Sequence, residues 1–148
     1  MDFTRKYIKM CEKAREIQGK WKPRVGDWVV DVWNKERPLV ICAISDSRKY
    51  LYLSSQLASS KDNIYLNHIS KVFCIFTQDQ LQDLRNPNNF FWDLMAMEEV
   101  LREMKRAYGI LLSSPYFSSG EQFWLANVMW VKYKKIWDED KEKWIKKE

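Results

Sequence analysis

The hydrophobic positions of this chain are densest between residues 118 and 137. From Phe123 to Val131 the apolar run is broken by one polar residue, Asn127. A helix on a protein surface is apolar along one stripe only, so this segment predicts a helix that is buried on several sides. The run is about half of the roughly 20 residues that span a bilayer, which favours a core helix over a membrane span.

Two segments have the sequence of a helix capping box, in which a hydroxyl and a side chain three residues later satisfy free helix N–H groups. The first segment predicts a short helix that ends near Leu84 or Arg85, before Pro87. The second predicts the start of the buried helix. The pairs are Thr77 with Gln80 in the first segment, and Ser118 with Glu121 or Ser119 with Gln122 in the second.

Residues 3–18 have the spacing of an amphipathic helix. Thr4 suits the N-cap position, and Gly19 suits the residue after the helix end. Apolar residues recur three and four positions apart, with Lys, Arg and Glu between them, which predicts one buried face. The residues of this face are Tyr7, Met10, Cys11, Ala14 and Ile17.

Residues 21–76 alternate short β-rich runs with polar turns. Gly26 follows Pro23 in the turn before the first run, and it suits a backbone with positive φ. Short strands joined by close turns predict a small antiparallel, curled sheet, and their spacing favours a partly closed, SH3-like barrel. The predicted strands are residues 28–33, 38–45, 49–54, 64–66 and 72–76.

Residues 77–148 are predicted to be helical. After the short capped helix, the apolar spacing predicts a long helix over residues 90–108, which Gly109 ends. Trp144 is expected to fold back onto the core. The whole chain, residues 1–148, is therefore predicted to form a single α+β domain, in which the curled sheet packs with N-terminal and C-terminal helices.

The net charge of +5 is unevenly distributed. Residues 1–76 carry 14 Lys and Arg against 8 Asp and Glu, whereas residues 77–148 carry 11 against 12. The basic excess therefore belongs to the N-terminal half, where it favours phosphate backbones or an acidic protein as partners. A solvated surface of helices and turns gives the same pattern without any partner.

Aromatic residues accompany this basic excess. Cations that follow phosphates, beside rings that stack on bases, are the pattern of a single-stranded nucleic-acid site. Basic turns next to aromatic strands also occur without a ligand, because most large rings are buried in cores. The candidate binding surface consists of Lys20, Trp21, Lys22, Arg24, Trp28, Arg48, Lys49, Tyr50 and Tyr52.

No set of residues has the spacing of a catalytic, cofactor-binding or metal site. His68, the single histidine, lacks the His or Cys neighbours that a zinc site requires. The cysteines Cys11, Cys42 and Cys74 are odd in number, and we expect them to be reduced, buried thiols of a cytoplasmic protein. Burial in apolar strands raises thiol pKa values, which disfavours a catalytic pair of Cys42 or Cys74 with His68. We therefore predict no enzyme activity, no cofactor and no metal.

Three motifs resemble a group of short, uncharacterised proteins encoded by bacteriophages and prophages. The third motif is the most specific, whereas the first recurs in unrelated β-barrels. In similar proteins the segment around Ile64 runs almost directly into the helix after Thr77, but here residues 67–76 intervene. The resemblance implies a phage origin and no assigned activity. The motifs are Trp21-x-Pro23-x-x-Gly26-Asp27, then Asp79-Gln80-Leu81-Gln82, and Gly120-Glu121-Gln122-x-Trp124-Leu125-Ala126-x-Val128-Met129-x-x-Lys132-Tyr133-x-x-x-Trp137.

Two functions from different classes remain open. The first is a non-enzymatic, phage-encoded protein-interaction module that acts on a protein partner in the bacterial cytoplasm. The alternative is a nucleic-acid-binding accessory protein that uses the basic, aromatic-rich N-terminal half. A hydrolase or transferase lacks any residues to which catalytic roles can be assigned. We expect no signal peptide, because the first residues lack an apolar region. We also expect no membrane association, because the apolar run is too short to span a bilayer.

Overall fold

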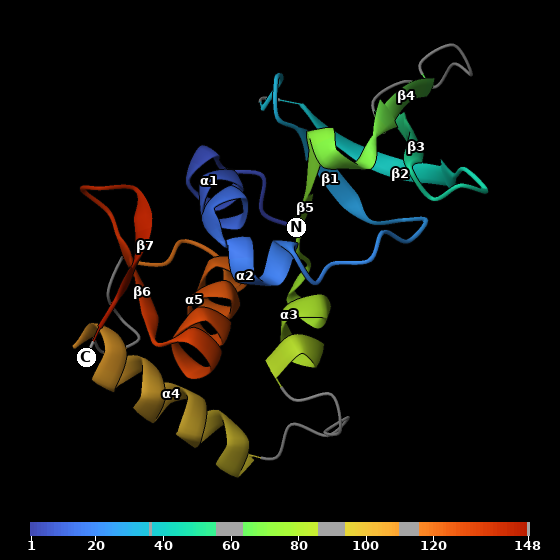
Figure 1. Ribbon diagram of the computed structural model, residues 1–148. Coiled ribbons are helices and arrows are strands. Elements are labelled where there is room, and N and C mark those ends of the chain that lie inside the picture. The colour runs from blue at the N-terminus through green and yellow to red at the C-terminus, as the bar shows by residue number, and fades with distance from the viewer. Residues whose placement is uncertain (36, 56–63, 86–93, 110–115, 148) are drawn as a thin grey trace. The chain divides into compact units, whose positions relative to one another are not determined.

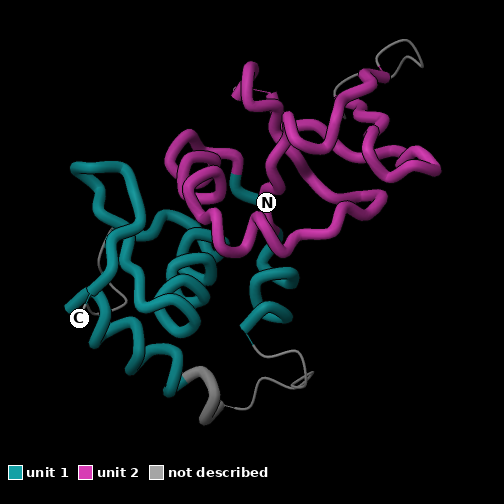
Figure 2. The backbone as a smooth tube through the Cα atoms, viewed as in Figure 1, with its two compact units in different colours: residues 1–2, 77–148 teal, residues 3–76 magenta. Residues whose placement is uncertain are grey.

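The computed structural model describes residues 1–35, 37–55, 64–85, 94–109 and 116–147. The chain divides into two compact units (Figure 2). The sheet unit (unit 2 in Figure 2) is Phe3–Phe76, and the helical unit (unit 1) is Met1–Asp2 with Thr77–Glu148. The boundary coincides with the predicted boundary between the β-rich and helical regions. The single domain over residues 1–148 stays a prediction.

The sheet unit is built on a five-stranded antiparallel sheet (Figure 1). Its strand order is β4-β3-β2-β1-β5, so the first strand pairs with both the second and the last. The predicted α+β fold with a small antiparallel sheet is confirmed. The elements are β1 (Trp28–Asp31), β2 (Pro38–Ile44), β3 (Tyr50–Ser54), β4 (Ile64–His68), the 3-10 turn η1 (Ile69–Lys71) and β5 (Val72–Ile75).

The sheet curls around an apolar core on one of its faces. One contact shows the curl, because it joins two strands that are not neighbours in the sheet. Asn67 of β4 donates a hydrogen bond to the Asp31 carboxylate at the end of β1. The Val32 N–H donates to the Lys71 carbonyl (2.9 Å), which extends the pairing of β1 with β5 by one residue. β4 and β5 are the two edges of this sheet, so closure into an SH3-like barrel stays a prediction. The core consists of Val29, Leu39, Ile41, Leu51, Leu53 and Val72.

The N-terminal helix is interrupted, whereas the sequence predicts one continuous helix over residues 3–18. The φ and ψ of Ala14 (−81° and 59°) lie outside the helical region and divide the helix. Thr4 is the N-cap as predicted, since its Oγ1 accepts from the Tyr7 N–H (3.3 Å). The predicted face is buried throughout, and the Tyr7 hydroxyl donates to the Phe76 carbonyl (2.6 Å). The two parts are α1 (Arg5–Lys13) and α2 (Arg15–Gln18).

Gln18 provides the physical reason for the interruption. Its amide nitrogen donates to the carbonyls of Cys11 (3.0 Å) and Cys74 (2.8 Å). Its amide oxygen accepts from the Cys74 N–H (3.0 Å). One side chain therefore satisfies a carbonyl near the helix break and both backbone groups of Cys74 at the β5 edge.

The helical unit contains three helices in its described residues. The first begins with the predicted capping box: the Thr77 N–H donates to Gln80 Oε1 (2.8 Å), and the Gln80 N–H to Thr77 Oγ1 (3.2 Å). The indole N–H of Trp130 donates to Glu103 (2.8 Å), which joins the second helix to the third. The predicted start of the long helix at residues 90–93 lies outside the described residues. The helices are α3 (Gln78–Arg85), α4 (Leu94–Tyr108) and α5 (Gly120–Tyr133).

Helix α5 starts at the second of its two predicted capping pairs. Ser119 is the N-cap, and its Oγ accepts from the Gln122 N–H (3.1 Å). The Ser119 hydroxyl and the Gln122 amide both donate to the buried Asp2 carboxylate, at 2.6 and 2.8 Å. The prediction of a helix buried on several sides is confirmed. Its buried residues are Gln122, Trp124, Leu125, Ala126, Asn127, Val128 and Met129.

The helix predicted through residue 137 ends at Tyr133 and a β-hairpin follows, so the prediction of a helical region over residues 77–148 is wrong for its last part. Lys134 adopts the left-handed conformation (φ 53°), and its N–H donates to the Trp130 carbonyl (3.0 Å). Trp137 then lies opposite Trp144 across a hairpin, with ring centroids 5.2 Å apart. Burial of Trp144 confirms that it folds back onto the core. The hairpin consists of β6 (Lys135–Asp138) and β7 (Lys143–Lys146).

Candidate functional site

Four of the nine predicted surface residues lie in the connection between α2 and β1. They are Lys20, Trp21, Lys22 and Arg24. The half-buried Trp21 ring packs against the sheet core, and its indole N–H donates to an Asp27 carboxylate oxygen (2.9 Å). Trp21 therefore stabilises one end of the sheet and does not form a free platform for stacking.

The next three predicted residues differ in exposure. Trp28 on β1 is half-buried, and its ring lies 4.7 Å from that of Phe3. Arg48 and Lys49 are exposed in the turn between β2 and β3. The structure therefore leaves these two cations at the surface and gives the Trp28 ring a packing role.

Tyr50 and Tyr52, the last two predicted residues, belong to an exposed apolar surface on β3 and β4. In β3 they alternate with two buried leucines, so they lie on the face opposite the core. The register places Tyr52 opposite Leu66 and Ser54 opposite Ile64. We name this surface the outer patch; its residues Tyr50, Tyr52, Ile64 and Leu66 are 44%, 40%, 56% and 59% exposed.

The sequence identifies the two tyrosines of the outer patch but misses Ile64 and Leu66. In the run Ile64-Tyr65-Leu66 every residue is apolar or aromatic, so no polar–apolar alternation shows which side faces solvent. The register against β3 decides this. The sequence gives one signal for this, the clear alternation of apolar and aromatic residues in β3. That alternation determines the outer face of β4 only once β4 is known to pair with β3.

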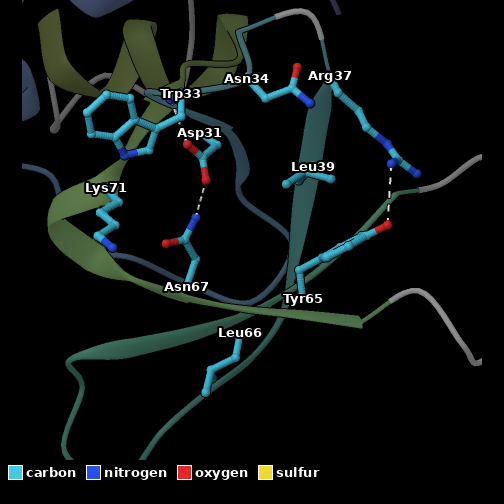
Figure 3. A pocket seen from close by; sticks show the side chains of 9 residues that line it. All are labelled: Asp31, Trp33, Asn34, Arg37, Leu39, Tyr65, Leu66, Asn67 and Lys71. Carbon is cyan, nitrogen blue, oxygen red and sulfur yellow. Dashed lines mark hydrogen bonds between the residues drawn. The ribbon is translucent and has the colours of Figure 1, made fainter.

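A groove of about 330 Å³ lies where β4 approaches the connection between β1 and β2 (Figure 3). We name it the seam groove. Tyr65 and Asn67 approach it from β4, whereas Leu66 between them points away (Figure 3). The opposite wall includes Trp33, which is 83% exposed. The lining residues are Asp31, Trp33, Asn34, Arg37, Leu39, Tyr65, Leu66, Asn67 and Lys71.

The Asp31 carboxylate joins the two walls of the seam groove. One of its oxygens accepts from the Asn67 side chain, and the other accepts from the Trp33 N–H (2.7 Å). Both oxygens therefore have donors within the protein.

Two exposed cations face the seam groove. Arg37 donates to the hydroxyls of Tyr65 (3.4 Å) and Ser55 (3.0 Å), and its guanidinium lies 5.6 Å from the centroid of the Tyr65 ring. These partners are neutral. Within the described part of the chain, neither Arg37 nor Lys71 forms an ion pair with an acidic side chain. Together with Asp31, they give the groove a net charge of about +1.

The three cysteines differ in exposure, which corrects the prediction that all three are buried. Cys42 is exposed because it follows the buried Ile41 and so lies on the solvent-facing side of β2. A register shift between Ile41 and Ala43 keeps Ala43 on that side as well. Cys11 and Cys74 are buried. Burial, reinforced by the charge of a nearby carboxylate, raises the pKa of the Cys74 thiol.

His68 ends β4 and has neighbours other than cysteine. Its Nδ1 lies 2.7 Å from Ser70 Oγ, and its ring meets the Tyr50 ring edge-on at 5.3 Å. Among the residues that the structure describes, no three His, Cys, Asp or Glu side chains are grouped to hold a metal ion. No described helix is both long and apolar enough to cross a membrane. The absence of enzyme activity, cofactor and metal stays a prediction.

Comparison of the chain with protein-family models, with curated proteins and with solved structures gives no match. The resemblance of the three motifs to phage proteins therefore stays a prediction.

Proposed function

We propose that this protein is a non-enzymatic interaction module that binds another protein through the outer patch. The observation that carries the proposal is the grouping of four exposed apolar side chains on one face of β3 and β4. Contiguous exposed apolar surface is typical of protein-binding sites, and tyrosine is enriched where such sites contribute most binding energy. The proposal includes a phage origin and action in the bacterial cytoplasm, which the three motifs support.

We also propose that the sheet unit is an SH3-like partial barrel. The pairing of β1 with both β2 and β5 returns the meander to its first strand, as closure of a small barrel requires. The Asn67–Asp31 hydrogen bond spans the remaining opening between β4 and the end of β1. The seam groove is then the unclosed seam of the barrel.

Nucleic-acid binding is the second candidate, and the basic excess of residues 1–76 favours it. Single-stranded nucleic acid requires rings that are free to stack on bases. Of the four predicted rings, Trp21 and Trp28 pack against neighbouring side chains, whereas Tyr50 and Tyr52 are exposed. A mobility-shift titration tests this candidate, because its affinity must fall steeply with added salt.

The outer patch is tested with Leu66→Ser and the matched control Val25→Ser. Val25 is 64% exposed and lies before β1, outside the patch. Truncating an apolar residue at the centre of an interface weakens binding about tenfold or more. Each variant is used to capture proteins from a bacterial lysate, and quantitative mass spectrometry measures what it binds. We expect a protein that the wild-type chain and Val25→Ser both capture to be absent from the proteins that Leu66→Ser captures. Purification and titration of that protein then measure the loss directly.

The proposal is contradicted if Leu66→Ser and Val25→Ser capture the same proteins in equal amounts. It is also contradicted if the wild-type chain captures no protein whose binding depends on Leu66. Circular dichroism of both variants verifies that each has the wild-type fold.

A further inference from the structure

We propose that the segment of the partner bound here is an extended acidic strand that pairs with the free edge of β4 and lies across the seam groove. This inference rests on the proposed function, since it specifies how a protein partner is held and what chemistry it carries. Three observations support it: the backbone groups of β4, the two faces beside β4, and the charge of the groove.

The backbone of β4 has hydrogen-bonding groups on the side away from β3. In antiparallel strands, residue pairs that exchange hydrogen bonds alternate with pairs that do not. The Ile69 N–H donates to the Lys49 carbonyl (2.9 Å), so in this register the bonded residues of β4 are Asn67 and Tyr65. The N–H and carbonyl of Leu66, which lies between them, therefore face away from β3.

The two edges of the sheet differ in how they are protected. At the β5 edge, the Gln18 amide occupies both the N–H and the carbonyl of Cys74. At the β4 edge, the His68 N–H is bonded to a neighbouring side chain, but no described side chain bonds the backbone of Ile64 or Leu66. β4 also lacks the Lys, Glu, Asp and Pro residues that protect exposed edges. This edge is therefore open to an added strand.

A strand added to β4 directs its side chains alternately to two faces. On one face these side chains extend the outer patch beside Leu66, where apolar residues fit. On the other face they enter the seam groove beside Tyr65 and Asn67, opposite Arg37 and Lys71. A segment that alternates apolar and acidic residues matches both faces at once.

The acidic half of this pattern follows from the charges of the seam groove. Arg37 and Lys71 are exposed and have no acidic partner in the described chain. The carboxylate that lines the groove, Asp31, already accepts from the Asn67 side chain and from the Trp33 N–H. A carboxylate on the added strand is therefore attracted to the two cations, whereas a lysine at the same position is repelled.

Two short capped peptides test the inference, one alternating valine with glutamate and the other alternating valine with lysine. Amide hydrogen exchange of the isotope-labelled full chain is followed by NMR as each peptide is added up to its solubility limit. The glutamate peptide is expected to slow exchange at Leu66 and Ile64 about tenfold at roughly ten times its Kd. The lysine peptide is expected to leave both amides unchanged. Absence of protection by the glutamate peptide overturns the inference.

Variants of the edge and of the groove separate their contributions. Leu66→Pro removes the outward N–H but keeps an apolar side chain, and edge strands tolerate proline where the N–H faces solvent. Leu66→Val keeps the N–H, an apolar side chain and the strand preference. We expect the proline variant to lose glutamate-peptide binding and the valine variant to retain it. Arg37→Gln combined with Lys71→Gln is expected to weaken binding by about threefold to tenfold.

Failure of the inference is distinguishable from failure of the proposed function. If Leu66→Pro binds a lysate protein as tightly as wild type does, whereas Leu66→Ser no longer binds it, the proposed function stands and strand addition is wrong. Protection of the Leu66 amide that rises with protein concentration alone shows a second copy of the chain at this edge. Protection by an oligothymidylate shows nucleic acid there, and either result overturns the inference.

Discussion

The Cys42 thiol lies on the solvent-facing side of β2, whereas Cys11 and Cys74 are buried. Burial raises the pKa of the Cys74 thiol, so its reactive thiolate form is scarce at neutral pH. Iodoacetamide is therefore expected to label Cys42 in the native protein and to label the other two only after unfolding in urea. Mass spectrometry of both samples measures the labelled sites. Native labelling of Cys74 at the rate of Cys42 contradicts this expectation.

Labelling of Cys42 also tests the location of the outer patch. Its neighbour Ala43 lies opposite Tyr52 in the sheet register, so Cys42 borders the patch. A partner bound to the patch is expected to slow the labelling of Cys42, because it covers the adjoining surface.

At the scale of the element, α5 holds two tryptophans with different surroundings. Trp124 is 4% exposed, so Trp124→Ala is expected to lower the free energy of unfolding by about 3–5 kcal/mol. Trp130 is half-buried, and its indole N–H donates to Glu103 (2.8 Å). Trp130→Phe keeps a ring and removes this hydrogen bond, at an expected cost of about 1 kcal/mol. Urea unfolding followed by circular dichroism measures both losses. Equal losses contradict the expectation that the buried Trp124 contributes more to stability than the hydrogen bond of Trp130.

Helix starts could be predicted from the sequence because their caps are local. Thr4 and the Thr77–Gln80 pair each satisfy N–H groups within a few residues. The ends of α3 at Arg85 and of α4 at Tyr108 also lie where Pro87 and Gly109 predict them. Two other interruptions depend on distant contacts. The break at Ala14 accompanies the bonding of Gln18 to Cys74, 56 residues away. Likewise, α5 ends before the β6–β7 hairpin, in which Trp137 packs against Trp144. The spacing of apolar residues along a helix does not reveal this pair.

The candidate site shows the same division between local and distant information. Alternation within β3 is local, and it identified Tyr50 and Tyr52. The free edge of β4 depends on the order of all five strands, which the spacing of short runs does not determine. The seam groove depends on the curl that joins Asp31 to Asn67 across 36 residues. The aromatic and basic residues could therefore be predicted, but the surface that they form could not.

At the scale of the whole molecule, stability at high pH depends on phenols inside the helical unit. Burial raises the pKa of Tyr108, and this effect exceeds that of the hydrogen bond that its hydroxyl accepts from the Trp137 N–H (3.1 Å). Burial, together with nearby carboxylates led by Glu139, also raises the pKa of Tyr116. The Tyr116 hydroxyl donates to the Trp137 carbonyl (2.6 Å), so it must keep its proton for this bond.

Because the pKa values of both phenols are raised in the folded protein, stability depends on pH in the alkaline range. Below the unfolded pKa of about 10, both phenols are neutral in the folded and unfolded states, and their contribution is fully present. As the pH rises above about 10, the unfolded state releases protons that the folded state retains, so the free energy of unfolding falls. The titration of Tyr108 lowers the free energy of unfolding by at most about 1.4 kcal/mol per pH unit. Solvent screening makes the contribution of the partly exposed Tyr116 smaller. Tyr108→Phe is therefore expected to make the decline between about pH 10 and pH 11.5 shallower.

Urea unfolding at a series of pH values measures this slope, and comparison with wild type cancels the titration of groups that both proteins share. Tyr108→Phe also removes the acceptor of the Trp137 N–H, which shifts stability at every pH and leaves the slope as the informative quantity. Tyr52→Phe removes an exposed phenol from the sheet unit, so it serves as the matched control for tyrosine content. Equal slopes in wild type and Tyr108→Phe contradict the retention of this proton by the folded protein. A shallower slope in Tyr108→Phe alone identifies burial within the helical unit, and not tyrosine content, as the cause of the alkaline loss of stability.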